Sequence, residues 1–255
     1  MTTAHRPAGR VALVTGGGSG LGRACALALA REDWSLVLVG RREEALAETA
    51  AQCAAPPGRV LAVPTDITDP QQVGALFDAV RNRFGRLDLL VNNAGAPAPR
   101  LPPEDVAYED WSRVLDTIVT GAFLCSQQAF RIMRDQDPQG GRIINNGAPS
   151  AHTPRPCSTA YTAAKHALLG LTRSLSLDGR RHRIACGQID VGNVAPPDGS
   201  PQPPALQADG SRAVEATLPV ERFTEALVLM ASMPLDTNVQ SLTVLPTTMP
   251  FVGRG

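Results

Sequence analysis

Short, almost wholly apolar runs alternate along the chain with longer segments in which apolar residues recur every three or four positions. The short runs are typical of strands buried on both faces of a parallel sheet, and the longer segments are typical of helices packed against it. The pattern predicts strands at 11–15, 35–39, 60–63, 87–91, 141–146, 183–188 and 239–244. It predicts helices at 23–31, 43–54, 70–84, 111–135, 158–178 and 220–233. This alternation predicts a single α/β domain over residues 1–255, a doubly wound parallel sheet flanked by helices.

The segment 196–210, PPDGSPQPPALQADG, interrupts the alternation because turn-forming residues dominate it. It is too polar for the core, so it is expected to be a mobile loop. Long loops in compact domains are usually functional, and the alternative is a disordered insertion.

A glycine-rich turn follows the first predicted strand and precedes a strong helix former at 23–31. Glycines let a backbone approach a dinucleotide pyrophosphate closely, and a helix N-terminus supplies N–H groups and the positive end of a dipole. A strand, a glycine turn and a helix in this order indicate a Rossmann-like cofactor site, in a spacing that is a variant of GxGxxG. The predicted contacts are Gly16, Gly18, Ser19, Gly20, Leu21 and Gly22.

The end of the second predicted strand bears on which cofactor would bind. An NAD site usually places an Asp or Glu about 20 residues beyond the glycines, whereas an Arg there accommodates the 2′-phosphate of NADP. The sequence reads Gly40-Arg41-Arg42 at this place, so NADP(H) is favoured. The alternative is that both arginines only open the next helix, although cations at a helix N-terminus oppose its dipole.

Tyr161 and Lys165 are four residues apart in the predicted helix 158–178 and therefore share one face. An ammonium beside a phenol stabilises the phenolate, so Lys165 is expected to lower the pKa of Tyr161 from about 10. Tyr161 is thus a candidate general acid. The alternative is a surface pair that meets by chance.

Composition limits the classes of partner. Lys plus Arg and Asp plus Glu number 24 each, so no basic field is available for nucleic acid or an anionic membrane. No apolar run is long enough to span a membrane, and no signal-peptide pattern follows Met1. Five cysteines without a CxxC motif favour reduced thiols of a cytoplasmic protein. We therefore expect a soluble protein that acts on a small molecule.

Three motifs, in this order and spacing, resemble the short-chain dehydrogenase/reductase family: TGGGSGLG at 15–22, NNAG at 92–95 and YTAAK at 161–165. The resemblance implies that Tyr161 transfers a proton while hydride passes between a nicotinamide cofactor and a substrate. It implies that Lys165 lowers the Tyr161 pKa and binds the nicotinamide ribose. The further cofactor contacts that it implies are Asp66, Ile67, Asn93, Ala94, Gly95, Tyr161, Lys165, Val191, Gly192 and Val194.

The sequence departs from the family pattern at two catalytic positions. Ile118 stands where the family has an Asn that helps to hold a water for proton relay, and Ala148 stands where it has a Ser that hydrogen-bonds the substrate oxygen. Such a donor contributes up to a few kcal/mol to transition-state stabilisation. Ile118, Ala148, Ser150 and His152 form the expected substrate pocket, with Ser150 as a candidate replacement for the serine and His152 as a candidate functional group. Pro149 argues against a strand that continues to Ser150, and a lone histidine is more often structural.

Other departures concern the region after the sixth predicted strand. Val191 and Pro196 replace the Pro and Thr of a family pattern that grips the nicotinamide, so a looser grip is expected. The resemblance also makes residues from about 195 to 216 a substrate lid. In similar proteins the last helix, the last strand and the tail form an interface, so the apolar tail 249–253 supports a homo-oligomer, either a dimer or a tetramer.

Two functions stay open on these residues. The first is an NADP(H)-dependent oxidoreductase that transfers a hydride to or from a C=O or C=N group of a small molecule. Loss of the serine matters less for an iminium, which hydride neutralises, so imine reduction is an alternative to ketone reduction. The second is a catalytically impaired scaffold that binds the cofactor. Retention of both Tyr161 and Lys165 favours the enzyme.

Overall fold

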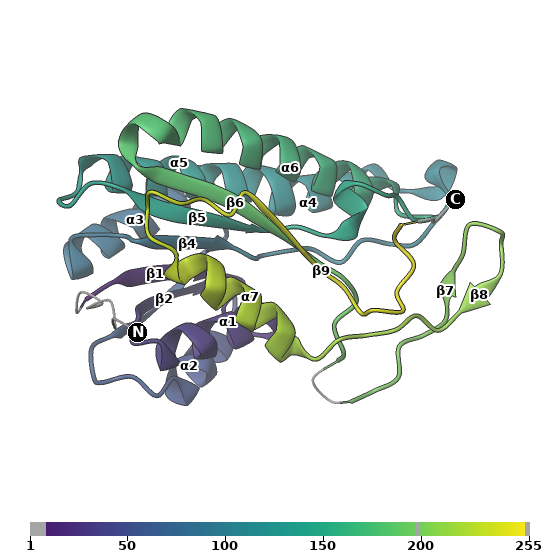
Figure 1. Cartoon of the computed structure of the whole chain (residues 1–255), viewed down its shortest axis with the longest axis horizontal. Helices are drawn as coiled ribbons and strands as arrows, with labels where there is room; N and C mark the ends of the chain where they lie inside the picture. Colours follow the sequence, from purple (N-terminus) through teal and green to yellow (C-terminus); the bar gives the residue numbers. More distant parts are fainter. Residues whose placement is uncertain (1–8, 197–198, 253–255) are drawn as a thin grey trace.

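The computed structural model describes residues 9–196 and 199–252. Its centre is a seven-stranded sheet in the order β3-β2-β1-β4-β5-β6-β9 (Figure 1). The strands are β1 (Val11–Thr15), β2 (Ser35–Gly40), β3 (Val60–Pro64), β4 (Leu89–Asn92), β5 (Gly141–Asn146), β6 (Ile184–Val191) and β9 (Ser241–Val244). All neighbours in this sheet are parallel, so their carboxyl ends meet at one edge. The predicted doubly wound α/β fold is confirmed.

Helices cover both faces of the sheet (Figure 1). The helices are α1 (Gly20–Arg31), α2 (Glu43–Gln52), α3 (Pro70–Phe84), α4 (Tyr108–Leu115), α5 (Gly121–Asp135), α6 (Thr159–Gly179) and α7 (Val220–Ser232). The apolar sides of α1, α2 and α7 pack on one face, and those of α3, α5 and α6 pack on the other, with α4 beside α6. Burial of apolar area on both faces explains why the central strands are rich in apolar residues.

The ends of α3 show how local sequence determines an element. Asp69 caps the helix through its carboxylate, which accepts the backbone N–H groups of Gln71 and Gln72 at 2.8 and 3.1 Å. Pro70 occupies the first helical position, where its missing N–H costs no intrahelical hydrogen bond. Gly85 ends the helix in the left-handed conformation, with a φ of 71°. The predicted bounds of this helix are confirmed.

The sixth strand is longer than predicted. The apolar pattern ends it at residue 188, whereas β6 continues to Val191 with β5 and β9 paired on its two sides. Asp190 interrupts the apolar pattern, yet this residue is fully buried. Gln188 and His152 hydrogen-bond the Asp190 carboxylate, which offsets the cost of burying it.

Two further differences lie in the second half of the chain. The helix predicted at 111–135 begins earlier, with α4, and contains a π-helical turn at Asp116–Thr120 before α5. The expected lid, about residues 195–216, contains a short antiparallel hairpin, β7 (Ala205–Leu206) with β8 (Arg212–Ala213), and β7 lies within the segment predicted as a loop. Strands of two residues are too short for periodicity to reveal them.

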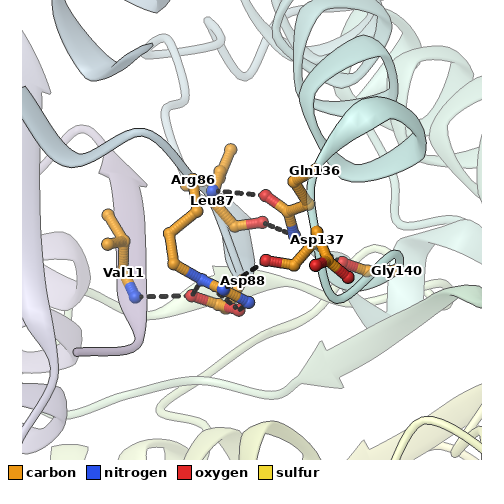
Figure 2. A network of polar contacts seen from close by, with 7 residues as sticks. All are labelled: Val11, Arg86, Leu87, Asp88, Gln136, Asp137 and Gly140. Atoms are coloured by element: carbon orange, nitrogen blue, oxygen red, sulfur yellow. Dashed lines mark hydrogen bonds and ion pairs between the residues drawn. The ribbon is translucent and has the colours of Figure 1, made fainter. Parts of the chain in front are cut away.

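A polar network closes the amino edge of the sheet, as Figure 2 shows. Asp88 accepts hydrogen bonds from the Val11 N–H at 2.9 Å and from Arg86 Nη2 at 2.7 Å. The Gln136 side chain accepts the Leu87 N–H at 2.9 Å and donates to the Leu87 carbonyl at 3.0 Å. The network joins the start of β1, the start of β4 and the end of α5. The polar groups of this edge are thus satisfied within the protein, and the open space lies at the opposite edge.

Candidate active site

The carboxyl ends of β1, β2, β3 and β4 border a cleft of about 660 Å³. β1 and β4 are neighbours in the sheet although β2 and β3 lie between them in the sequence. The direction of winding therefore changes here, and ligands of open α/β sheets bind at such a point. The predicted cofactor residues that line the cleft are Gly16, Gly18, Ser19, Arg41, Arg42, Asp66, Ile67, Ala94 and Gly95.

The glycine turn leaves no room for side chains. Gly16 has a φ of +69°, which L side chains rarely adopt, and a Cβ on Gly22 would lie 2.0 Å from the Gly16 carbonyl oxygen. Ser19 precedes α1 and makes no side-chain cap bond to it. Arg23 Nη2 donates to the Gly18 carbonyl at 2.7 Å and holds the turn from behind. A bare backbone at a helix N-terminus fits the pyrophosphate of a dinucleotide.

Thr15 joins the NNAG turn to the glycine turn. Its hydroxyl accepts the backbone N–H groups of Asn93 and Ala94 at 2.9 and 3.0 Å. The Asn93 side chain donates to the Thr15 carbonyl at 3.0 Å and accepts from the Asn146 amide at 2.9 Å. Asn146 ends β5, and its carbonyl oxygen accepts a hydrogen bond from Lys165 Nζ at 2.6 Å. One chain of hydrogen bonds therefore links β1, the end of β4, β5 and α6.

Arg41 and Arg42 follow β2, line the cleft and are exposed. Within the described ranges, neither side chain forms a hydrogen bond or an ion pair. The Asp66 carboxylate accepts the backbone N–H and the hydroxyl of Thr68 at 3.0 and 2.8 Å, so this acid shapes the loop after β3. Two cations therefore border the cleft directly at the end of β2, and Glu43 and Glu44 follow them in the first turn of α2.

Tyr161 and Lys165 share a face of α6, with Lys165 Nζ 5.4 Å from the centroid of the Tyr161 ring. The predicted lowering of the Tyr161 pKa is wrong, because burial raises this pKa to about 12. The charge of Arg155 acts to lower it and that of Asp190 to raise it. Burial lowers the pKa of Lys165 to about 8, against the effect of Asp190. At neutral pH, Tyr161 keeps its proton and Lys165 keeps most of its charge.

A second cavity, of about 270 Å³, adjoins the cleft at Ala96, which lines both. Ala148 lies in its wall, where the resemblance implies a serine. The size of the cavity suits a small ligand. The predicted site residues that line it are Ala148, Ser150, Tyr161, Val191 and Gly192.

Ser150 brings a hydroxyl to this cavity. β5 ends at Asn146, and a 3₁₀ turn at Pro149–Ala151 stands where a continued strand would be. Ser150 is 5% exposed, and its hydroxyl forms no hydrogen bond with any described residue. The hydroxyl borders the cavity and is therefore available to donate a hydrogen bond to a ligand oxygen there.

Two residues of the predicted substrate pocket, His152 and Ile118, lie outside the lining of this cavity, and that part of the prediction is corrected. His152 Nε2 lies 2.8 Å from Asp190 Oδ2, and its ring meets Phe251 edge-on with 6.5 Å between centroids. Ile118 is 2% exposed and lines a narrower space beside Lys165 that has no room for a water molecule. Spacing along the chain does not show which way these side chains turn.

Other predicted cofactor residues lie behind the cleft or outside it. Val194 lines neither space and forms an isolated bridge with Leu218. Lys165 lines the narrow space next to Ile118. The residues that support the turns without lining the cleft are Gly20, Leu21, Gly22 and Asn93.

Part of the apolar tail is covered by its own chain. Met249 is buried and lines the second cavity, and Phe251 meets His152. Val252 is exposed, and residue 253 lies outside the described residues. The tail's apolar character therefore does not call for a partner at Met249, whereas Phe251 is half-buried and the homo-oligomer stays a prediction.

Several polar lining residues were not predicted from the sequence. Arg155 stands between two prolines shortly before Tyr161. A cation in so rigid a segment is the sequence pattern from which Arg155 could have been predicted as a site residue. The others give no signal, because their position depends on how the loops fold over the sheet edge. Among them are Arg100, Ser158 and Asn193 in the second cavity, and Thr65, Thr68, Arg113, Asp116 and Thr117 in the cleft.

Three structural findings limit the chemistry of the described chain. No group of three or more His, Cys, Asp or Glu side chains among the described residues is arranged to hold a metal ion. No helix in the described ranges is long and apolar enough to cross a membrane. All five cysteines are free thiols.

A family model described as short chain dehydrogenase matches residues 10–202. The chain belongs to the short-chain dehydrogenase family. The oxidoreductase YohF of Escherichia coli (strain K12) is 37% identical to this short-chain dehydrogenase over 215 residues, 84% of this chain and 83% of YohF. Sulfoacetaldehyde reductase 2 of Chromohalobacter salexigens is 30% identical over 244 residues, 93% of this chain and 94% of the reductase. The solved structure of levodione reductase has a TM-score of 0.82 at 28% identity and covers 94% of this chain and 97% of its own.

The resemblance that the three sequence motifs indicate is thereby confirmed, together with the Rossmann-like fold. The family consists of oxidoreductases that bind nicotinamide cofactors. In this short-chain dehydrogenase, the cleft beside the glycine turn fits such a cofactor, because bare backbone and a helix N-terminus border it.

Proposed function

We propose that this short-chain dehydrogenase is an NADP(H)-dependent oxidoreductase that transfers a hydride to or from a C=O or C=N group of a small molecule. The observation that carries the proposal is the position of Tyr161, which lines a cavity of substrate size next to the cofactor cleft. Lys165, four residues further on, donates a hydrogen bond from Nζ to the carbonyl oxygen of Asn146 at the end of β5. The candidate proton donor Tyr161 therefore lies in a cavity that adjoins the cofactor cleft.

The cofactor, when bound, supplies or accepts the hydride. In reduction, Tyr161 donates a proton to the substrate heteroatom, and its pKa of about 12 keeps it protonated at neutral pH. Lys165 is charged below its pKa of about 8, and its charge stabilises the phenolate that Tyr161 becomes.

The residues of the cavity give an argument for C=N as the reacting group and another for C=O. Ala148 lacks a hydroxyl that would steady a developing oxyanion, which favours C=N, because an iminium loses its charge on accepting hydride. Ser150 offers a hydroxyl in the same cavity, which favours C=O. The name of one relative, sulfoacetaldehyde reductase 2, also denotes reduction of an aldehyde.

Restoring the serine by Ala148→Ser is expected to raise kcat/KM for activated ketones about tenfold, because a donor aimed at a developing oxyanion stabilises the transition state more than the ground state. Turnover of cyclic imines is expected to change little, since no oxyanion forms. The measurement is steady-state kinetics with NADPH on one panel of each compound class. Wild-type turnover of one panel alone would identify the bond type.

Ala148→Cys is the matched control, since a thiol of similar size is only a weak donor. An equal gain with Cys, or an equal gain on both panels, would contradict the role that we assign to the hydroxyl.

NADPH is expected to bind at least about tenfold more tightly than NADH, a difference of about 1.4 kcal/mol, because Arg41 and Arg42 offer cations to a 2′-phosphate. Arg41→Ala should remove most of this preference. Calorimetric titration of both cofactors measures it. Arg31→Ala, which removes an exposed arginine at the far end of α1, is the control and should keep the preference. Equal affinities in the wild type would refute the assignment.

A cofactor-binding scaffold without turnover is the second candidate. Ile118 favours it, because the space beside Lys165 has no room for the relay water that the family pattern implies. Tyr161 in the wall of the cavity favours the enzyme. NADPH binding without turnover on either panel, in the wild type and in Ala148→Ser, would establish the scaffold.

We also place the protein in the cytoplasm as a homo-oligomer, either a dimer or a tetramer. Free cysteines suit a reducing compartment. Leu229 on α7 and Val252 in the tail are exposed and offer apolar surface to a second copy. Sedimentation equilibrium measures the assembly, and a monomeric mass would exclude it.

A further inference from the structure

Cationic side chains line the 270 Å³ cavity beside Tyr161. Arg100 and Arg155 form part of its wall, and no Asp or Glu of the described ranges does. Arg100 is exposed, and its side chain forms no hydrogen bond or ion pair with any described residue. Arg155 is more enclosed, with 17% of its side chain exposed. A ligand in this cavity therefore meets positive charge from the wall and from the open side.

Arg155 is held in a defined position. Pro154 and Pro156 flank it and restrict its backbone. Its guanidinium pairs with Glu215 at 2.7 Å and donates to Asn193 Oδ1 at 3.2 Å, and Asn193 Nδ2 donates to Glu215 at 2.8 Å. A guanidinium ordered in this way loses little further side-chain freedom when it binds a ligand.

The acidic groups around the cavity lie behind its wall. Glu215 belongs to the expected lid, its side chain is 6% exposed, and it does not line the cavity. Asp190 is fully buried, with its carboxylate bonded to Gln188 and His152. The groups that face a ligand next to Tyr161 are thus cationic or neutral.

We propose that the substrate is a small oxo acid or imino acid, whose carboxylate binds Arg155 and is attracted by Arg100 while its C=O or C=N group lies at Tyr161. The inference rests on the proposed function for the reacting group and deepens it for the rest of the molecule. A guanidinium binds a planar carboxylate through two parallel hydrogen bonds, so it fixes orientation as well as charge. The exposed Arg100 raises the local concentration of anions at the opening.

Matched acids and amides test the class of substrate. The probes are 2-oxobutanoate, 4-oxopentanoate and 1-pyrroline-2-carboxylate, each with its primary carboxamide, which keeps the shape and removes the charge. With NADPH, kcat/KM for at least one acid should exceed that for its amide about tenfold or more, and the advantage should shrink as salt is added. Turnover of amides and acids at equal rates would overturn the inference and leave the proposed function intact.

Two variants separate anion binding from a merely structural ion pair. Arg155→Ala and Glu215→Gln both remove the pair, so a structural role would change the acid-to-amide ratio of kcat/KM in the same direction. If Arg155 binds the carboxylate, Arg155→Ala lowers this ratio about 10- to 100-fold, as expected for the loss of a charge-assisted hydrogen bond. Glu215→Gln should keep or raise the ratio, because a competing negative charge is removed. Equal losses in both variants would overturn the inference.

Arg155→Ala removes a largely buried ion pair and can therefore destabilise the fold. Arg155→Lys and Arg100→Ala provide the same test with a smaller effect on folding. Arg155→Lys keeps the charge and loses the planar fork, and it should lower the ratio in part. Arg100→Ala alters an exposed side chain and should raise KM for the acid more than for the amide.

Equilibrium binding makes the test independent of turnover. Pentanoate and pentanamide carry no reducible group and are titrated calorimetrically into the NADPH complex. Tighter binding of pentanoate that is weakened in Arg155→Lys or in Arg100→Ala supports the anion site even when no probe turns over. That combination would count against the proposed function alone. Equal binding of the two compounds would overturn the inference.

Discussion

Tyr161→Phe is expected to lower kcat/KM by about 10²–10⁴-fold, the usual contribution of a positioned general acid. The substitution removes one hydroxyl and keeps the ring, so the wall of the cavity changes little. The lost hydroxyl is the proton donor of the proposed reaction and is protonated at neutral pH, because its pKa is about 12. Steady-state kinetics measures the loss, and titration with NADPH should show that cofactor affinity is retained.

Tyr108 is the matched control, because it is the only other tyrosine in the sequence. It lies at the start of α4 with 75% of its surface exposed, so Tyr108→Phe should leave kcat/KM unchanged. Undiminished turnover in Tyr161→Phe would show that another group supplies the proton.

Gly22→Ala is expected to weaken NADPH binding at least about tenfold and to lower the free energy of unfolding by about 1–3 kcal/mol. The added Cβ would lie 2.0 Å from the oxygen and 2.6 Å from the carbon of the Gly16 carbonyl. Both are backbone atoms of the turn that would hold the pyrophosphate, so the turn itself must move. NADPH titration and urea unfolding measure the two effects.

Gly170→Ala provides the control for the added methyl group. Gly170 lies inside α6, and a Cβ there would meet no atom within 4 Å. This variant should raise the free energy of unfolding by about 0.5–1 kcal/mol, because alanine favours the helix, and it should bind NADPH normally. If Gly22→Ala and Gly170→Ala changed NADPH affinity and the free energy of unfolding alike, the close approach of Gly22 to Gly16 would not explain the effects of Gly22→Ala.

Most of the fold could be predicted from the sequence because its elements have local causes. Buried parallel strands are mostly apolar, and Asp69 with Pro70 marks the start of α3. The end of β6 could not be predicted in this way. Asp190 is a charged residue by its type, and the partners that allow its burial lie on another segment and earlier in the strand.

The site could be predicted in part for the same reason. The glycine turn lies at the cleft, Tyr161 in the wall of the cavity and Lys165 in the narrow space beside Ile118. The spacing of motifs along the chain does not show how deeply each side chain is buried. The direction of the Tyr161 pKa shift was therefore wrong. Arg155 depends on its long-range pairing with Glu215, which no local pattern reveals.

Ile118 also limits the path of protons through the proposed enzyme. No water fits in the space that Ile118 lines beside Lys165, so no water held in that space can relay a proton to Lys165. In the part of the chain that the structure describes, Tyr161 lines the substrate cavity and does not line that space. In the proposed enzyme, a proton that Tyr161 gives up is therefore expected to be replaced by way of the substrate cavity. Reprotonation of Tyr161 and release of product are thus expected to share this cavity, and product must leave it before the next turnover begins.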